Sequence, residues 1–176
     1  MEKTTLEIAM DMKKAINHAI AAHIENPKSP EDAIRFWDKK TPYVIHPIWC
    51  GMTLLTETKL PEDIRLPGYQ ALIWHDVLED TNLSLPDGTD AVVARLVGEM
   101  TFASFKEEQE LIDSKEDLIK LLKLYDKTSI LLDATWMKDE KWKNLVDYTL
   151  KLRQFVLDTY GDLNIVKIAG AVCIRR

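Results

Sequence analysis

The sequence is poor in cysteine, and this shortage narrows the class of protein. Only Cys50 and Cys173 are present among 176 residues, far apart and in apolar surroundings. They indicate buried, reduced thiols rather than a disulfide framework, and we therefore expect a cytoplasmic protein. Internal repeats and low-complexity segments are also missing.

Excess positive charge and long apolar runs are missing as well. The chain has 23 Lys and Arg against 29 Asp and Glu, a formal charge of −6, which argues against a general nucleic-acid-binding surface. No stretch approaches the roughly 20 apolar residues that span a membrane. The charged N-terminus, with Glu2, Lys3 and Asp11, does not have the pattern of a signal peptide. We expect neither nucleic acid nor membrane as a partner.

The alternation of apolar and polar residues that marks strands is absent too, whereas apolar residues recur at helical spacing. The hydrophobic fraction of 46% and the charged fraction of 30% are ordinary for a globular protein. A chain of this length builds one core. The sequence predicts a single all-α domain over residues 1–176.

Prolines divide the N-terminal half into expected helices. An amphipathic helix from Leu6 stops at Asn26, a helical turn covers residues 30–37, and a helix covers residues 43–58. A further helix covers residues 68–80, with Pro67 at its start.

The C-terminal half contains four expected helices and a polar connection. Asp90 should cap a helix of residues 91–100, and residues 102–113 predict a mobile segment or an irregular helix. Ser114 should cap a helix that is apolar around most of its circumference and central to the core, residues 118–132. A long helix ends at Gly161, and a last one follows in the tail.

Residues 74–81 concentrate ionisable groups directly after an apolar run: His75, Asp76, Glu79 and Asp80. Such groups are costly to hold near a core unless something pairs with them. Neutral imidazole and carboxylate are both ligands of divalent cations. The alternative is a helix end whose polar residues face water.

Two further residues favour the metal interpretation. His46 precedes Pro47 at the start of one expected helix, and Asp126 lies in the middle of the apolar helix. Side chains from three helices of a bundle can project into one cavity and build a mixed His/carboxylate site. We expect His18 and His23, on the first helix, to be structural.

This H…HD…D pattern resembles the HD superfamily of metal-dependent phosphohydrolases, and in particular the RelA/SpoT-type (p)ppGpp hydrolase domain and its small stand-alone homologues. Residues 43–47 are similar to that family's "YxxHP" and residues 71–81 to its "AALLHDVxEDT". Residues 96–101 are similar to "LVxxVT" and residues 123–127 to "KLADR". These motifs occur in the family's order within residues 6–137, and we expect residues 138–176 to add helices packed on the domain.

The resemblance implies an HD-domain helical bundle that removes pyrophosphate from the 3′ position of guanosine-3′,5′-bis(diphosphate), a small-molecule nucleotide. It implies one divalent ion, Mn²⁺ by analogy and Zn²⁺ or Fe²⁺ by ligand chemistry. Its expected ligands are His46, His75, Asp76 and Asp126. Glu79 and Asp80 would perform the acid–base chemistry. The residues expected to bind substrate are Arg35, Lys39, Lys40, Tyr43 and Lys123.

The chain departs from the family at positions that concern the substrate. Ile130, beside Ser129, stands where the family has a pocket asparagine, and the loop before Tyr43 is longer. Two alternatives therefore stay open: an HD phosphohydrolase acting on another nucleotide, such as a nucleoside monophosphate or an NADPH-like 2′-phosphate, or a non-catalytic metal-binding interaction protein. The presence of both Glu79 and Asp80 argues against the last. The sequence indicates no particular oligomeric state.

Overall fold

The structure, a computed structural model, describes residues 4–174. Within them the chain forms helices joined by short connections, with two isolated β-bridges and no strand, so the all-α prediction is confirmed. The α-helices are α1 (Thr5–Ile20), α2 (Ile45–Leu55), α3 (Glu62–Trp74), α4 (Val77–Asp80), α5 (Ala91–Met100), α6 (Phe105–Leu111), α7 (Asp117–Leu132), α8 (Asp139–Tyr160) and α9 (Asn164–Ile174). No helix among the described residues is long and apolar enough to cross a membrane.

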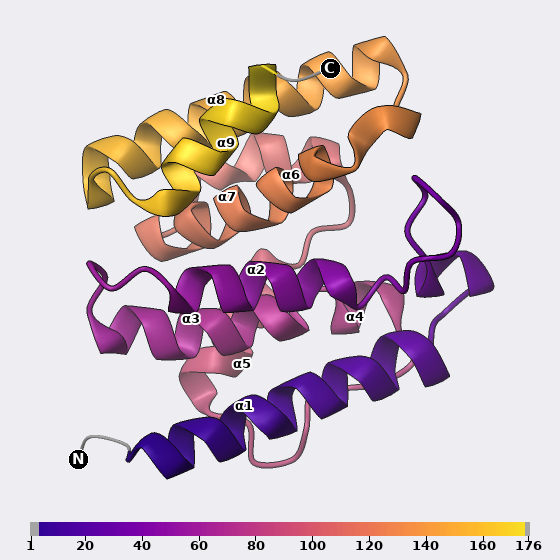
Figure 1. The fold of residues 1–176 in the computed structure, drawn as a ribbon, viewed down its shortest axis with the longest axis vertical. Coiled ribbons are helices and arrows are strands. Elements are labelled where there is room, and N and C mark those ends of the chain that lie inside the picture. Colours follow the sequence, from indigo (N-terminus) through magenta and orange to yellow (C-terminus); the bar gives the residue numbers. More distant parts are fainter. Residues whose placement is uncertain (1–3, 175–176) are drawn as a thin grey trace.

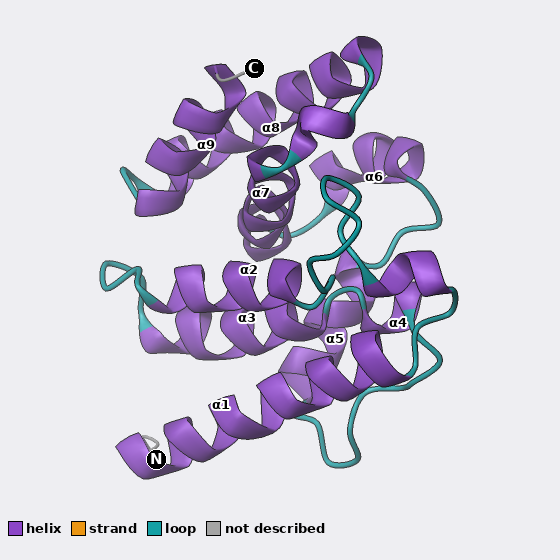
Figure 2. Ribbon diagram, turned by 45° about the vertical axis from the view of Figure 1, so that its right-hand side comes forward, coloured by secondary structure: helices purple, strands orange, loops and turns teal. Residues whose placement is uncertain are grey.

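Helix α7 is the centre of the bundle. It contacts α2, α3 and α5 on one side and α8 and α9 on the other, and Figure 1 shows it between these two groups of helices. Eleven of its 16 residues are buried, because a helix surrounded by neighbours has almost no face left for solvent. The predicted central helix is therefore confirmed. Helices α1 and α9, the first and last of the described residues, lie on opposite sides of the molecule (Figure 2).

The expected helix over residues 68–80 is wrong in two respects. Helix α3 begins at Glu62, after Pro61, and contains Pro67 in its interior, where the missing amide costs one bond near the helix start. The helix then ends at Trp74, and His75 and Asp76 form a turn before the single-turn helix α4. The ionisable residues of this segment therefore do not lie along one side of a continuous helix.

The polar segment after α5 is more ordered than its composition indicates. It contains α6, whose first turn is capped by Ser104: the hydroxyl accepts a hydrogen bond from the amide of Glu107. Ser114 does not cap α7, since it ends a short 3-10 turn and its hydroxyl donates to the carbonyl of Leu111. Helix α7 begins instead after Glu116.

Other boundaries agree with the sequence or differ by a turn. The first helix does stop at Asn26, after a π-helical turn over Ala21–Glu25, and the second is shorter than expected, with its end at Leu55. Near Pro30 only a 3-10 turn forms, Pro30–Ala33. Asp90 caps α5 by accepting from the amide of Val92, and Gly161 ends α8 at a φ of 82°, both as predicted.

The close approach of α2 and α3 generates a stability prediction. A Cβ on Gly51 would lie 2.6 Å from Cγ1 of Ile73 and 2.7 Å from the carbonyl oxygen of Tyr69. Because the backbone of α3 cannot yield cheaply, Gly51→Ala should lower the free energy of unfolding by about 1–3 kcal/mol in urea denaturation. Gly98 in α5 is the control: a Cβ there meets nothing within 4 Å, so Gly98→Ala should stabilise by up to about 1 kcal/mol. Equal effects of the two changes would contradict the packing argument.

Candidate metal centre

Four side chains from three parts of the chain converge beside α7. His46 lies in the first turn of α2, His75 and Asp76 form the turn between α3 and α4, and Asp126 lies in the middle of α7. Nε2 of His75 is 3.1 Å from Oδ2 of Asp76 and 3.3 Å from Nε2 of His46. Nε2 of His46 is 3.5 Å from Oδ2 of Asp76 and 3.4 Å from Oδ1 of Asp126. All four residues are buried.

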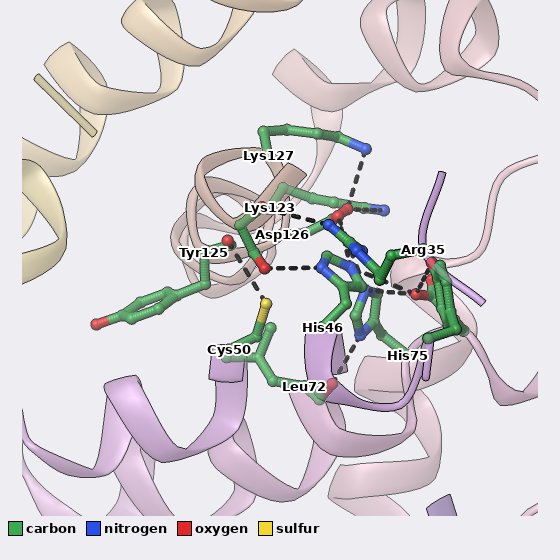
Figure 3. Close-up of polar contacts among 12 residues, drawn as sticks. Arg35, His46, Cys50, Leu72, His75, Lys123, Tyr125, Asp126 and Lys127 are labelled. Carbon is green, nitrogen blue, oxygen red and sulfur yellow. Dashed lines mark hydrogen bonds and ion pairs between the residues drawn. The ribbon is translucent and has the colours of Figure 1, made fainter. Parts of the chain in front are cut away.

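The two rings are oriented by bonds on their far sides. Nδ1 of His75 donates to the carbonyl oxygen of Leu72 at 2.7 Å, and Nδ1 of His46 lies 2.9 Å from the hydroxyl of Ser129. Figure 3 shows both contacts, with the Nε2 atoms of the rings facing each other and Asp126. A hydrogen bond from Nδ1 leaves the lone pair of Nε2 for a ligand, as at metal-binding histidines.

The donor atoms fit a single cation. Nitrogen and oxygen ligands about 2 Å from a shared ion lie about 3 to 3.5 Å from one another. The separations given above fall in this interval, and the separation of Nε2 of His75 from Oδ1 of Asp126 is 3.8 Å. One donor atom each from His46, His75 and Asp126 lies within 4.8 Å of the others. The site can hold a divalent ion with mixed N and O ligands.

Two lysines of α7 neutralise the buried acid of the cluster. Nζ of Lys123 and Nζ of Lys127 lie 3.2 and 3.0 Å from Oδ2 of Asp126, as Figure 3 shows. Although burial alone would raise it, these ammonium groups hold the pKa of Asp126 well below its usual range. Glu108 of α6 pairs with both lysines, at 3.2 and 2.8 Å. The Oδ1 atom of Asp126 thus stays free for a cation while Oδ2 is occupied.

Glu108 and Lys127 belong to the candidate site, although the sequence did not predict either of them there. Glu108 is buried, although it belongs to a segment whose charge pattern predicts exposure. Its burial follows from the pairing with two lysines, which no sequence spacing reveals. Lys127 offered a signal, since it is the last residue of the segment similar to "KLADR".

Beside the cluster lies a cavity of about 230 Å³ whose wall carries both predicted acid–base residues. Oε1 of Glu79 accepts a hydrogen bond from the amide of Phe102 at 3.1 Å. Burial, the charge of Asp76 and the charge of Glu79 raise the pKa of Asp80 to about 7. Burial and the charge of Asp76 also raise the pKa of Glu79. Carboxyl groups with raised pKa values can donate as well as accept a proton near neutrality.

A second cavity, of about 260 Å³, adjoins the first. The two share four wall residues, Tyr43, Phe105, Lys127 and Ile130. At the wall of the second cavity the rings of Phe36 and Trp136 pack with centroids 5.0 Å apart. The second cavity is therefore an apolar and aromatic continuation of the polar cavity beside the metal cluster.

The predicted substrate residues separate into two groups. Arg35, Tyr43 and Lys123 line the cavities. The hydroxyl of Tyr43 donates to Oδ2 of Asp76 at 2.7 Å, and Nε of Arg35 donates to Asp133 at 2.6 Å. Lys39 and Lys40 are exposed and belong to neither cavity wall.

The histidines of the first helix stay outside the cluster. The ring of His18 packs edge-on against Trp74. The ring of His23 is fully buried against Tyr43, with centroids 5.2 Å apart. Neither is among the clustered metal-ligating groups of the described residues, in agreement with the structural role expected for them.

Fold and site together define the class: an all-helical bundle with a buried His/Asp cluster that can hold a divalent cation. No protein-family profile matches the sequence, and no curated protein matches it. Among solved structures, the chain is similar to one described as a metazoan ortholog of SpoT that hydrolyzes ppGpp and plays a role in starvation responses. The TM-score is 0.68 at 21% identity, over 100% of this chain and 98% of that chain. The likeness confirms the predicted all-helical fold, which this chain shares with that protein.

The charge state of His75 generates a prediction for metal binding. Burial lowers its pKa, but the charges of Asp76 and Asp126 outweigh burial and raise it to about 9 in the metal-free protein. A cation at Nε2 must displace that proton, so one proton should be released per ion. Below pH 9, the affinity for Mn²⁺ should rise about tenfold per pH unit. Titration calorimetry at pH 6, 7 and 8 in buffers of different ionisation enthalpy measures this, and an affinity independent of pH would contradict it.

Proposed function

We propose that the chain is a metal-dependent phosphohydrolase of nucleotides, and that it removes pyrophosphate from the 3′ position of guanosine-3′,5′-bis(diphosphate). The observation that carries the proposal is the position of the His/Asp cluster at a cavity lined by two lysines and five carboxylates, of which Glu79 and Asp80 are not among the proposed metal ligands. These are groups that phosphoryl hydrolysis requires: a cation site, proton carriers and ammonium groups at the cavity wall. The fold shared with a protein described as hydrolysing ppGpp supports the same reaction.

His46, His75, Asp76 and Asp126 are the proposed ligands of one divalent ion, and we propose Mn²⁺. Such an ion supplies a Lewis acid that favours loss of a proton from water and polarises a phosphoryl oxygen. The protein's own contribution is orientation. Tyr43 fixes Asp76 from one side through its hydroxyl, and Lys123 and Lys127 fix Asp126 from the other.

Glu79 and Asp80 are the proposed carriers of protons. In the reaction, the oxygen of water forms a bond to the phosphorus attached to the ribose 3′ oxygen, and the bond between that phosphorus and the 3′ oxygen breaks. One carboxylate accepts the proton of the water, and the 3′ oxygen receives a proton as the nucleoside 5′-diphosphate leaves. The raised pKa values of Asp80 and Glu79 suit both tasks.

The two adjoining cavities suggest how a nucleotide is held. The phosphates would lie against Lys123 and Lys127, which carry positive charge at the wall of the cavity beside the cluster. The base would enter the second cavity, where Phe36, Tyr43 and Trp136 offer aromatic surface. Arg35 lines the second cavity beside Tyr43, and its Cζ atom lies 5.5 Å from the centre of the Tyr43 ring. We do not assign Lys39 and Lys40 to this path, because they lie outside both walls.

Ile130 favours a second candidate, hydrolysis of another nucleotide. Its side chain lines both cavities, at the position where the resembling family has an asparagine. An apolar wall cannot hydrogen-bond the ribose or base, and therefore discriminates weakly among nucleotides. A nucleoside monophosphate or an NADPH-like 2′-phosphate would place its phosphate beside the same cluster.

One experiment tests the function and separates the two candidates. Purified protein with Mn²⁺ is presented with ppGpp, NADPH and nucleoside mono- and triphosphates, and released phosphate and pyrophosphate are measured separately. Pyrophosphate from ppGpp is the expected result. Release of phosphate alone would favour the second candidate, and release from no member of the panel would contradict both and favour a binding protein.

Substitution at the two halves of the residue 74–81 segment should separate metal retention from turnover. Glu79→Gln removes a proton carrier and leaves the cluster intact, so metal content should stay at one ion while kcat falls about 10²- to 10⁴-fold. Asp76→Ala removes a ligand and should abolish metal retention. Metal analysis by mass spectrometry and steady-state kinetics check both. Full metal loading of Asp76→Ala would show that the ligand assignment is wrong.

A further inference from the structure

Helix α4 carries both proposed proton carriers, and it is only one turn long, Val77–Asp80. A single helical turn cannot stabilise itself in water, because nucleation fixes several residues for one hydrogen bond. The last carbonyl groups of any helix also lack partners within it. The position of Glu79 and Asp80 must therefore be determined by contacts from elsewhere in the chain.

The buried side chain of Val77 and the amide of Phe102, which donates to Glu79, supply two of those contacts. The backbone end of α4 is held by residues 26–28, which follow the first helix. The amide of Lys28 donates to the carbonyl of Asp80 at 2.9 Å, and the amide of Asn82 donates to the carbonyl of Asn26 at 2.9 Å. The side-chain amide of Asn82 donates to the carbonyl of Pro27 at 3.0 Å. Pro27 and Thr81 form an isolated antiparallel bridge. This short pairing attaches the end of α4 to the N-terminal part of the chain.

The side chain of Lys28 completes the attachment. Its ammonium group donates to the carbonyl of Leu78 at 3.0 Å and to the carbonyl of Glu79. A cation at a helix C-terminus satisfies the free carbonyl groups and opposes their partial negative charge. Lys28 contacts the backbone of Glu79 and not its carboxylate, and it belongs to the wall of neither cavity. Lys28 can therefore affect the position of the Glu79 and Asp80 carboxylates without contacting either carboxylate.

We propose that Lys28 is a positioning residue for Glu79 and Asp80, which holds the one-turn helix in the orientation that directs both carboxylates into the cavity beside the metal cluster. The proposal rests on the proposed function for its kinetic consequence. Its structural consequence, a more mobile α4 when the ammonium group is removed, does not depend on any activity.

Two measurements on four variants test the proposal. Lys28→Met keeps the aliphatic stem and removes the hydrogen-bond donor, and Lys28→Arg restores a donor. Asn82→Ala weakens the same pairing from the side of residues 81–82, because it removes the bond to the carbonyl of Pro27. Lys143→Met, at an exposed lysine on α8, is the matched control. Hydrogen–deuterium exchange of a peptide covering residues 78–82 reports the mobility of α4. Steady-state kinetics on the substrate found by the nucleotide panel, with metal analysis, report the effect on turnover.

Hydrogen bonds from a charged donor are strong enough to change a local opening equilibrium about tenfold, so exchange in Lys28→Met should be about tenfold faster. Its kcat should fall about tenfold, because displaced proton carriers transfer protons less efficiently, with KM and metal content unchanged. Asn82→Ala should change both quantities in the same direction, Lys28→Arg should recover both, and Lys143→Met should leave them as in the wild type.

Failure of the positioning role and failure of the function give different results. Unchanged exchange in Lys28→Met would overturn the proposal, whether or not the wild type hydrolyses a nucleotide. Faster exchange with a wild-type kcat would also overturn it, since α4 would then not need the attachment for turnover. A wild type that hydrolyses nothing would contradict the proposed function, and the exchange rates would still decide whether Lys28 holds α4.

Discussion

The pairing of Asp126 with its neighbours is the interaction on which the rest of the site depends. A carboxylate in the middle of the central helix would cost several kcal/mol if it were left without partners. Lys123 and Lys127 contact one of its oxygens, and the imidazole of His46 faces the other. The carboxylate of Glu108 pairs with Lys127 and compensates the second positive charge. The central helix can therefore carry a charged group in the core, and that group faces the cavity.

The arrangement divides the residue 74–81 segment into two structural parts. His75 and Asp76 belong to a turn at the end of α3, where Nδ1 of His75 donates a hydrogen bond to the carbonyl oxygen of Leu72. Glu79 and Asp80 belong to the separate turn α4, whose C-terminal end is hydrogen-bonded to residues 26–28. His75 and Asp76, the proposed ligands, are thus held by the core, whereas Glu79 and Asp80, the proposed proton carriers, also depend on contacts with residues 26–28.

The wall between the two cavities bears on the choice of substrate. Two lysines and the two aspartates of the metal cluster line one cavity, and aromatic side chains line the other. In the proposed function, Lys123 and Lys127 would attract any phosphate, because Coulomb attraction does not depend on the identity of the base. Recognition of the base would depend on hydrogen-bonding groups in the second cavity, where Ile130 contributes none. The residues of the site therefore indicate the type of reaction more clearly than they indicate which nucleotide is the substrate.

By itself the sequence determined the helical class, the central position of α7, the caps at Asp90 and Gly161, and the residues that meet at the cluster. Periodicity, capping residues and short motifs are local properties, and they can be read along the chain. Only the tertiary structure decided the break after Trp74, the burial of Glu108, the exposure of Lys39 and Lys40, and the contact of Lys28 with α4. Each of these depends on a partner far away in sequence: Glu108 is buried because two lysines of α7 face it, and α4 stands where residues 26–28 pair with it. Local patterns carry no information about such partners, because the energy that favours them arises only when the chain is folded.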